Sequence, residues 1–175
     1  MSDIRGIDPF GEHRDIVVDN TGSVYTTGRV FKSDTIVIPG IPSSGTYASG
    51  DAFGTQFAIQ GVPTHGTIAT VVYIDHANDG LTKDLVLFSA PFTGTADNAA
   101  FNVSDDELRN VVGVVRISTW YTFGSNQIGQ GTPALYYSTR PEFLGTLYGQ
   151  FVTRGADSFA TAAGHMPEFF FTVVD

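Results

Sequence analysis

The chain has 175 residues and a mass of 18.7 kDa, the size of one ordinary domain. Its 17 Val, 11 Ile and 20 Thr far outnumber its 7 Leu, 2 Met, 4 Glu and 2 Lys. Because branched side chains fit a pleated sheet better than a helix, this composition predicts a mostly β fold and excludes a helical bundle or a doubly wound α/β enzyme. The net charge of −9 argues against nucleic acid or an anionic membrane as a partner, and the lack of Cys excludes disulfides and cysteine zinc sites.

Residues 1–33 differ from the rest and are expected to form an extended N-terminal arm. Ile16–Val18 and Ser23–Tyr25 flank Asp19–Gly22, which predicts a small hairpin. An isolated hairpin is marginally stable in water, so it should lean on the main domain or on a partner; a flexible tail is the other interpretation. The first residues are polar and do not resemble a signal peptide, and no apolar run could span a bilayer, so we expect a soluble protein.

Residues 34–175 read as successive short strands separated by Gly and Pro. This spacing is typical of a jelly-roll-like antiparallel β-sandwich, which we predict as a single domain over 34–175. Ile41–Gly45 is expected to be a loop and His76–Gly80 a turn. The predicted strands are Thr35–Ile38, Ala52–Ile59, Thr67–Asp75, Asp84–Phe88, Val111–Trp120, Ala134–Ser138, Leu144–Arg154 and Phe169–Val174.

One short helix is predicted after Ser104. Ser104 and Glu107 have the spacing of a capping box, and the acidic residues of the first turn complement the helix dipole. We expect about two turns, with Leu108 and Val111 facing inward.

No residue pattern marks a catalytic or metal site. Asp75–Gly80 offers three oxygen side chains but lacks the final Glu of an EF-hand, and a turn explains it better. The sequence contains neither a serine-nucleophile elbow nor a phosphate-binding glycine loop, and nothing selects two carboxylates for glycoside hydrolysis. The histidines also lack metal-ligand spacing: His13, His65, His76 and His165. We therefore predict a non-enzymatic protein without metal or cofactor.

The aromatic residues allow two interpretations. Trp120, Tyr121 and Tyr136 could stack on a sugar, which would make the chain a carbohydrate-binding β-sandwich. However, 14 of the 22 aromatic residues are Phe, which lacks a polar group for recognition at a surface. A phenylalanine-rich core with aromatic subunit contacts is therefore favoured.

A series of motifs resembles, in its order, a family of small tailed-bacteriophage structural proteins. The likeness covers residues 34–175, so the first 33 residues are extra, and Met166–Phe171 is more aromatic than the family leads us to expect. The motifs are Tyr47–Gly54, Leu85–Phe88 with Pro91, Asp97–Phe101, Ser104–Leu108, Val111–Val114, Leu147–Gly149 and Val152–Gly155.

The resemblance implies a jelly-roll virion protein that decorates and cements the head. Such a protein binds the outer surface of the assembled shell, so its partner would be the major capsid protein, and assembly would take place in the host cytoplasm. Analogy with other cement proteins implies a homotrimer, and a tail or baseplate protein of the same fold is the alternative location. The residues expected to anchor the arm on the shell are Phe10, Ile16, Val17, Val18, Val24, Tyr25 and Phe31.

Overall fold

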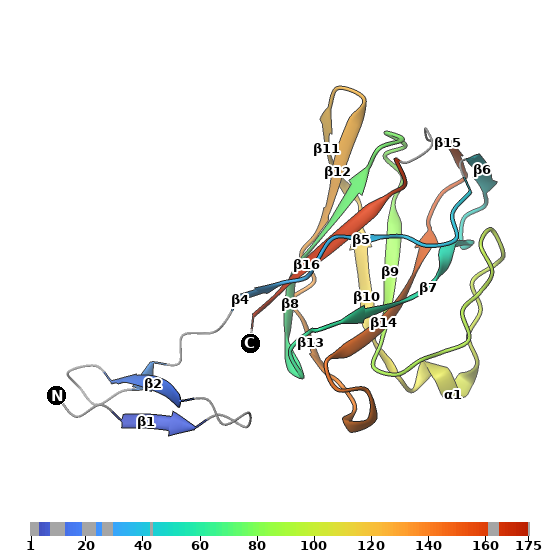
Figure 1. Cartoon of the computed structure of the whole chain (residues 1–175). Helices are drawn as coiled ribbons and strands as arrows, with labels where there is room; N and C mark the ends of the chain where they lie inside the picture. Colours follow the sequence, from blue (N-terminus) through green and yellow to red (C-terminus); the bar gives the residue numbers. More distant parts are fainter. Residues whose placement is uncertain are drawn as a thin grey trace.

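The computed structural model describes most of the chain, and Figure 1 shows a sandwich of two antiparallel sheets with one short helix. The described residues are 4–7, 13–18, 24–25, 30–42, 44–160 and 165–174.

Eight strands form the two layers of the sandwich, and every ladder between them is antiparallel. One sheet has the order β10-β9-β14-β7 and the other contains β12-β8-β16-β4. These two strand orders are those of a jelly roll, so the predicted fold class is confirmed. The bounds are β4 Val30–Lys32, β7 Ala52–Gln60, β8 His65–Asp75, β9 Lys83–Phe88, β10 Val111–Ile117, β12 Asn126–Gly131, β14 Thr146–Thr153 and β16 Glu168–Val174.

Further short strands complete the sheets. β11 (Thr119–Phe123) pairs with β12 and lies at the end of its sheet, while β13 (Leu135–Ser138) pairs with β8. β5 (Ile36–Val37) pairs with β16. We call the sheet that contains β11 the β8 sheet and the other the β9 sheet.

Aromatic rings fill the space between the sheets. The rings of Phe57 and Phe151 lie 5.0 Å and 5.2 Å from Phe169, and the ring of Tyr73 lies 5.5 Å from Phe151, all with tilted or edge-to-face geometry. Such pairs add to the gain from burial. The phenylalanine-rich core expected from composition is therefore present, and the aromatic C-terminal segment supplies part of it through β16.

The outer face of the β9 sheet is also buried. Residues 89–110, which connect β9 to β10, lie over it. Phe92 of this segment forms a second apolar cluster with Val86, Phe88 and Val152 of the sheet. As a result, β9 is buried along its whole length on both faces.

The structure corrects several local predictions. Val111–Trp120 is not one strand: it divides at Ser118, where the chain leaves the β9 sheet and enters the β8 sheet. Ile41–Gly45 is not wholly loop, because β6 (Ser44–Tyr47) pairs with β15 (Asp157–Ala160). Neither β6 nor β15 has a strong alternating pattern, so only the pairing of the two segments reveals the strands.

The helix α1 (Asp105–Leu108) begins as predicted but is shorter. The capping box between Ser104 and Glu107 is formed. The helix has a single turn, and Leu108 is exposed, so its predicted inward orientation was wrong. Val111 packs against the second apolar cluster as expected.

The N-terminal segment contains the predicted hairpin and one further strand. β2 (His13–Val18) pairs with β3 (Val24–Tyr25), which confirms the hairpin, and β1 (Ile4–Ile7) adds to the free side of β2. Val30–Lys32, expected in the arm, instead forms β4 and pairs with β16. The sheet of the sandwich therefore starts at Val30.

Candidate functional site

The two outer faces of the sandwich differ in their cover. The β9 sheet carries residues 89–110, whereas among the described residues no comparable segment lies over the outer face of the β8 sheet. Figure 1 shows the β11–β12 hairpin extending from this sheet beyond the end of the sandwich. The apolar residues on this face, which we call the uncovered face, include Val72, Ile74, Tyr121, Phe123, Ile128 and Phe170.

Strand alternation places these side chains outside. In β8 and β12, the neighbours of Ile74 and Ile128 are buried between the sheets, so Ile74 and Ile128 point to the opposite side. The register aligns Tyr121 with Ile128 and Ile128 with Ile74, which makes one apolar row across three strands. Tyr121 is 52% exposed and Phe123 is 64% exposed. A row of this kind, ending in exposed aromatic rings, is suited to contact with another apolar surface.

Charged residues are scarce on the uncovered face. Residues 65–74 and 117–139, which supply most of it, contain no Asp, Glu, Lys or Arg. Its far side is bounded by Glu168, aligned with Ile74, and by Lys32, whose ammonium lies 4.2 Å from the centre of the Phe170 ring. The uncovered face therefore has few charged residues, although the chain as a whole is acidic.

The three residues expected for sugar binding do not come together. Trp120 packs against the core, where its ring meets that of Tyr73 edge-on at 5.8 Å. Tyr121 and Tyr136 are exposed, but they align with positions seven residues apart on β8, Ile74 and Thr67. Seven residues of strand span about 23 Å, which is too far for one stacking platform.

The expected arm anchors fall into three groups. Ile16, Val17, Val18, Val24 and Tyr25 lie in β2 and β3, and Phe10 lies outside the described residues. Phe31 lies in β4 and packs against the core of the sandwich. Phe31 therefore contributes to this domain's own core.

A buried polar centre lies at one end of the core. The ammonium of Lys83 is fully buried and donates to both oxygens of Asp79, at 2.8 Å and 3.0 Å. It also lies 4.9 Å from the ring centre of Phe53 and 5.5 Å from that of Tyr73, within range of a cation–π interaction. Burial raises the pKa of Asp79 to about 6, although Lys83 acts in the opposite direction.

Asp75 holds the turn that carries Asp79. Its carboxylate accepts hydrogen bonds from the backbone N–H groups of Ala77, Asn78 and Asp79, and the Gln127 amide donates to it at 2.5 Å. The turn predicted for this segment is confirmed. Because these oxygens are taken up by backbone and amide donors, the geometry assigns Asp75 a structural role.

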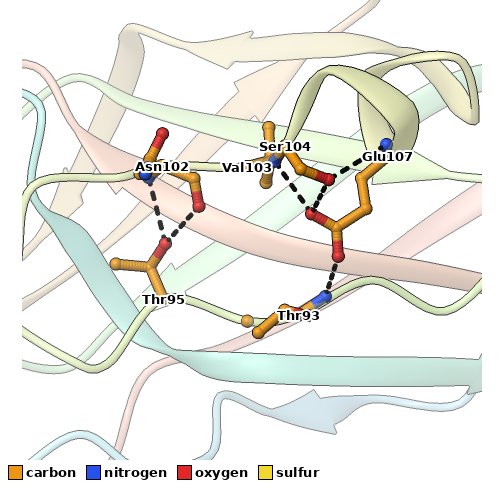
Figure 2. A pocket seen from close by; sticks show the side chains of 7 residues that line it. Thr93, Thr95, Asn102, Val103, Ser104 and Glu107 are labelled. Atoms are coloured by element: carbon orange, nitrogen blue, oxygen red, sulfur yellow. Dashed lines mark hydrogen bonds between the residues drawn. The ribbon is translucent and has the colours of Figure 1, made fainter.

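A shallow pocket of about 470 Å³ lies within the segment that covers the β9 sheet, between residues 93–95 and the start of α1 (Figure 2). Glu107 holds its two sides together, since its carboxylate accepts from the backbone N–H of Thr93 at 2.5 Å and from that of Ser104 at 2.8 Å. These hydrogen bonds, that of Thr93 first, lower the pKa of Glu107 to about 2. Glu107 is therefore ionised at neutral pH and is not placed to act as a general acid.

Ser104→Ala should destabilise the protein by about 1 kcal/mol, since Ser104 accepts from the backbone N–H of Glu107 and donates to its carboxylate. Urea unfolding followed by circular dichroism measures the difference. Ser118→Ala is the matched control, because Ser118 is exposed in the break between β10 and β11. Equal losses in both variants would contradict a capping role.

The structure brings two histidines together that the sequence separates. The rings of His76 and His165 lie 5.6 Å apart. In the part of the chain that the structure describes, no three His, Asp or Glu side chains form a group that could hold a metal ion.

No helix of the described residues is long and apolar enough to cross a membrane.

No protein-family model matches the chain, and no curated protein matches its sequence. The class is therefore defined by the fold: a jelly-roll β-sandwich with one outer face covered by its own chain and the other uncovered.

Proposed function

We propose that the chain is a non-enzymatic structural protein of a bacteriophage virion, which decorates the outer surface of the capsid and stabilises it. The order of motifs over residues 34–175 resembles such proteins, and the jelly-roll sandwich has the fold that the resemblance implies. A protein that binds only the assembled shell stabilises it by mass action, and many symmetric copies multiply a modest affinity.

The observation that carries the proposal best is the strand pairing ahead of the sandwich. Three short strands, β1 to β3, pair with one another in a segment that precedes the first strand of the jelly roll. Sheets this small need an apolar surface to pack against. A capsid surface would provide it, so the segment suits an arm that docks on the major capsid protein.

The register suggests which side of the arm would dock. Ile4 pairs with Ile16, and Val18 pairs with Val24. Because paired residues share a face and faces alternate along a strand, the register places these four residues on one face of the arm sheet. Arg5 and Asp15, which pair with each other, are at positions on the opposite face of the arm sheet.

The acidic composition fits an outer position, since a protein that lines packaged DNA would need basic residues to offset the phosphates. The carbohydrate-binding alternative has less support, because Trp120 packs on the core and Tyr136 lies far from Tyr121.

The first test is the number of copies of this chain relative to the major capsid protein in purified virions, measured by quantitative mass spectrometry. A ratio of one, or a simple symmetric fraction of it, is expected. A handful of copies per particle would assign the chain to the tail or baseplate, and its absence from virions would refute a structural role.

The arm can be tested separately on shells assembled without this chain. Deletion of residues 1–29, which keeps β4, should leave the sandwich folded but reduce the bound copies about tenfold or more, since each lost 1.4 kcal/mol weakens binding tenfold. The double variant Ile16→Lys with Val18→Lys should act like the deletion. Val17→Lys is the control: Val17 is among the anchors expected from the sequence, but the register puts it at a position on the opposite face from Ile16 and Val18. Unchanged occupancy after deletion would exclude the arm while leaving the copy-number test intact.

A further inference from the structure

We propose that the chain associates with a second copy of itself through the β11 end of the uncovered face, with Tyr121 and Phe123 at the centre of the contact. This inference concerns the free chain in solution and does not depend on the proposed function.

The first argument is the position of β11 in its sheet. β11 is an end strand that pairs with β12, and among the described residues no strand pairs with its other side. Natural proteins protect such edges with charged residues, proline or a covering segment. The opposite end of the same sheet follows this rule, because β4 contains Lys32 and is followed by Asp34. In the part of the chain that the structure describes, the edge of β11 has no such protection.

One edge of the β9 sheet, β7, differs from the edge of β11. Beside β7, the backbone of Ala52 exchanges hydrogen bonds with Asn98 and Ala99, and Thr55 donates to Pro39. These loops occupy backbone groups that an edge strand would otherwise present. The β11 edge, next to two exposed aromatic rings, is thus the better place for an intermolecular contact.

The lack of charged residues on this surface favours a second copy of the chain as the partner. Each copy has a net charge of −9, so most arrangements of two copies bring carboxylates together and are disfavoured. The β11 end of the uncovered face comes from a segment without charged residues, residues 117–139, and allows like-charged chains to approach closely. A basic partner would gain no attraction from this surface. The aromatic and apolar side chains there provide the type of contact found at the centre of subunit interfaces.

The test measures the mass of the full-length chain in solution by sedimentation velocity over a range of concentrations. The wild-type chain should form a species whose mass is a multiple of 18.7 kDa. Phe123→Glu and Tyr121→Glu should each raise the dissociation constant at least about tenfold, because they place a carboxylate in an apolar contact between acidic chains. Both side chains are more than half exposed, so the fold should be retained.

Leu144→Glu is the matched control. Leu144 is 65% exposed and lies between a short 3-10 helix (Pro141–Phe143) and β14, so this variant adds the same charge at an equally exposed apolar position elsewhere. It should associate like the wild type. Higher salt should preserve or strengthen the wild-type association, because screening weakens repulsion between acidic copies.

Three results would overturn the inference. The wild type could be monomeric at its highest soluble concentration, or the control could dissociate as much as Phe123→Glu does. Alternatively, a monomeric chain could bind an oligosaccharide through Tyr121, which would make this face a ligand site.

Discussion

Lys83→Met should destabilise the protein by about 3–5 kcal/mol at pH 8. The substitution removes the ammonium that donates to Asp79 and leaves a buried carboxylate close to Asp75. Removing one partner of a buried ion pair has a cost of this size, because the remaining charge is neither solvated nor compensated. Met fills a similar volume, so packing contributes little.

The stability lost in Lys83→Met should increase with pH. The pKa of Asp79 is raised by burial from 3.8 to about 6, so the folded state holds this proton more tightly than the unfolded state. The stabilising contribution is complete below about pH 3.8 and is lost as the pH rises through about 6. Lys83 lowers this pKa, so its removal raises it further. The difference between variant and wild type should therefore be small at pH 5 and large at pH 8.

Urea unfolding at these two pH values measures the effect. The double variant Lys83→Met with Asp79→Asn is the control, since it removes both charges and should recover most of the lost stability at pH 8. A single variant as stable as the wild type at pH 8, or a double variant no better than the single one, would contradict the assigned pairing.

Asp84→Asn should cost about 2–3 kcal/mol at neutral pH. The Asp84 carboxylate, only 2% exposed, accepts from Nε of Arg116 at 2.9 Å and from Nε of Arg154 at 2.7 Å. Hydrogen bonds between charged groups are among the stronger contributions to stability. The cost stays below that of Lys83→Met because the arginine side chains, 63% and 39% exposed, can be hydrated once released.

The pH dependence of Asp84 has the opposite sign to that of Asp79. Burial acts to raise the pKa of Asp84, but the hydrogen bonds from Arg116 and Arg154 outweigh it, so the pKa lies below 3.8. The stabilisation is therefore present above about pH 4 and is lost as the pH falls through this lowered pKa. Asp106→Asn is the control: its ion pair with Arg109 is exposed on both sides and should contribute nothing measurable.

Much of the sandwich could be predicted because its strands carry local signals. Runs of branched and aromatic residues located β7, β8, β9, β14 and β16 to within a few residues, and the capping box located α1. The pairing of β6 with β15 could not be found, because it joins segments more than a hundred residues apart that lack a strong pattern of their own.

The candidate site was harder to predict than the fold. The sequence drew attention to Trp120 and Tyr121 as neighbours, yet alternation along β11 sends one ring to the core and leaves the other exposed. The buried Lys83 was missed altogether, since lysine normally signals a solvent-exposed position. A hint was available in Asp79, four residues earlier, but only the turn held by Asp75 brings the two groups together.

The sequence by itself determined that this protein is an antiparallel β-sandwich, because strand formation depends on local residue type and on a period of two. Only the tertiary structure decided which outer face of the sandwich is left exposed. That outcome depends on where residues 89–110 fold back, since they cover one sheet and leave the other with Tyr121 and Phe123 exposed. A surface is buried only when a second surface packs against it. The local residue pattern of a strand shows that its face can be buried, but it does not show which other segment will cover it.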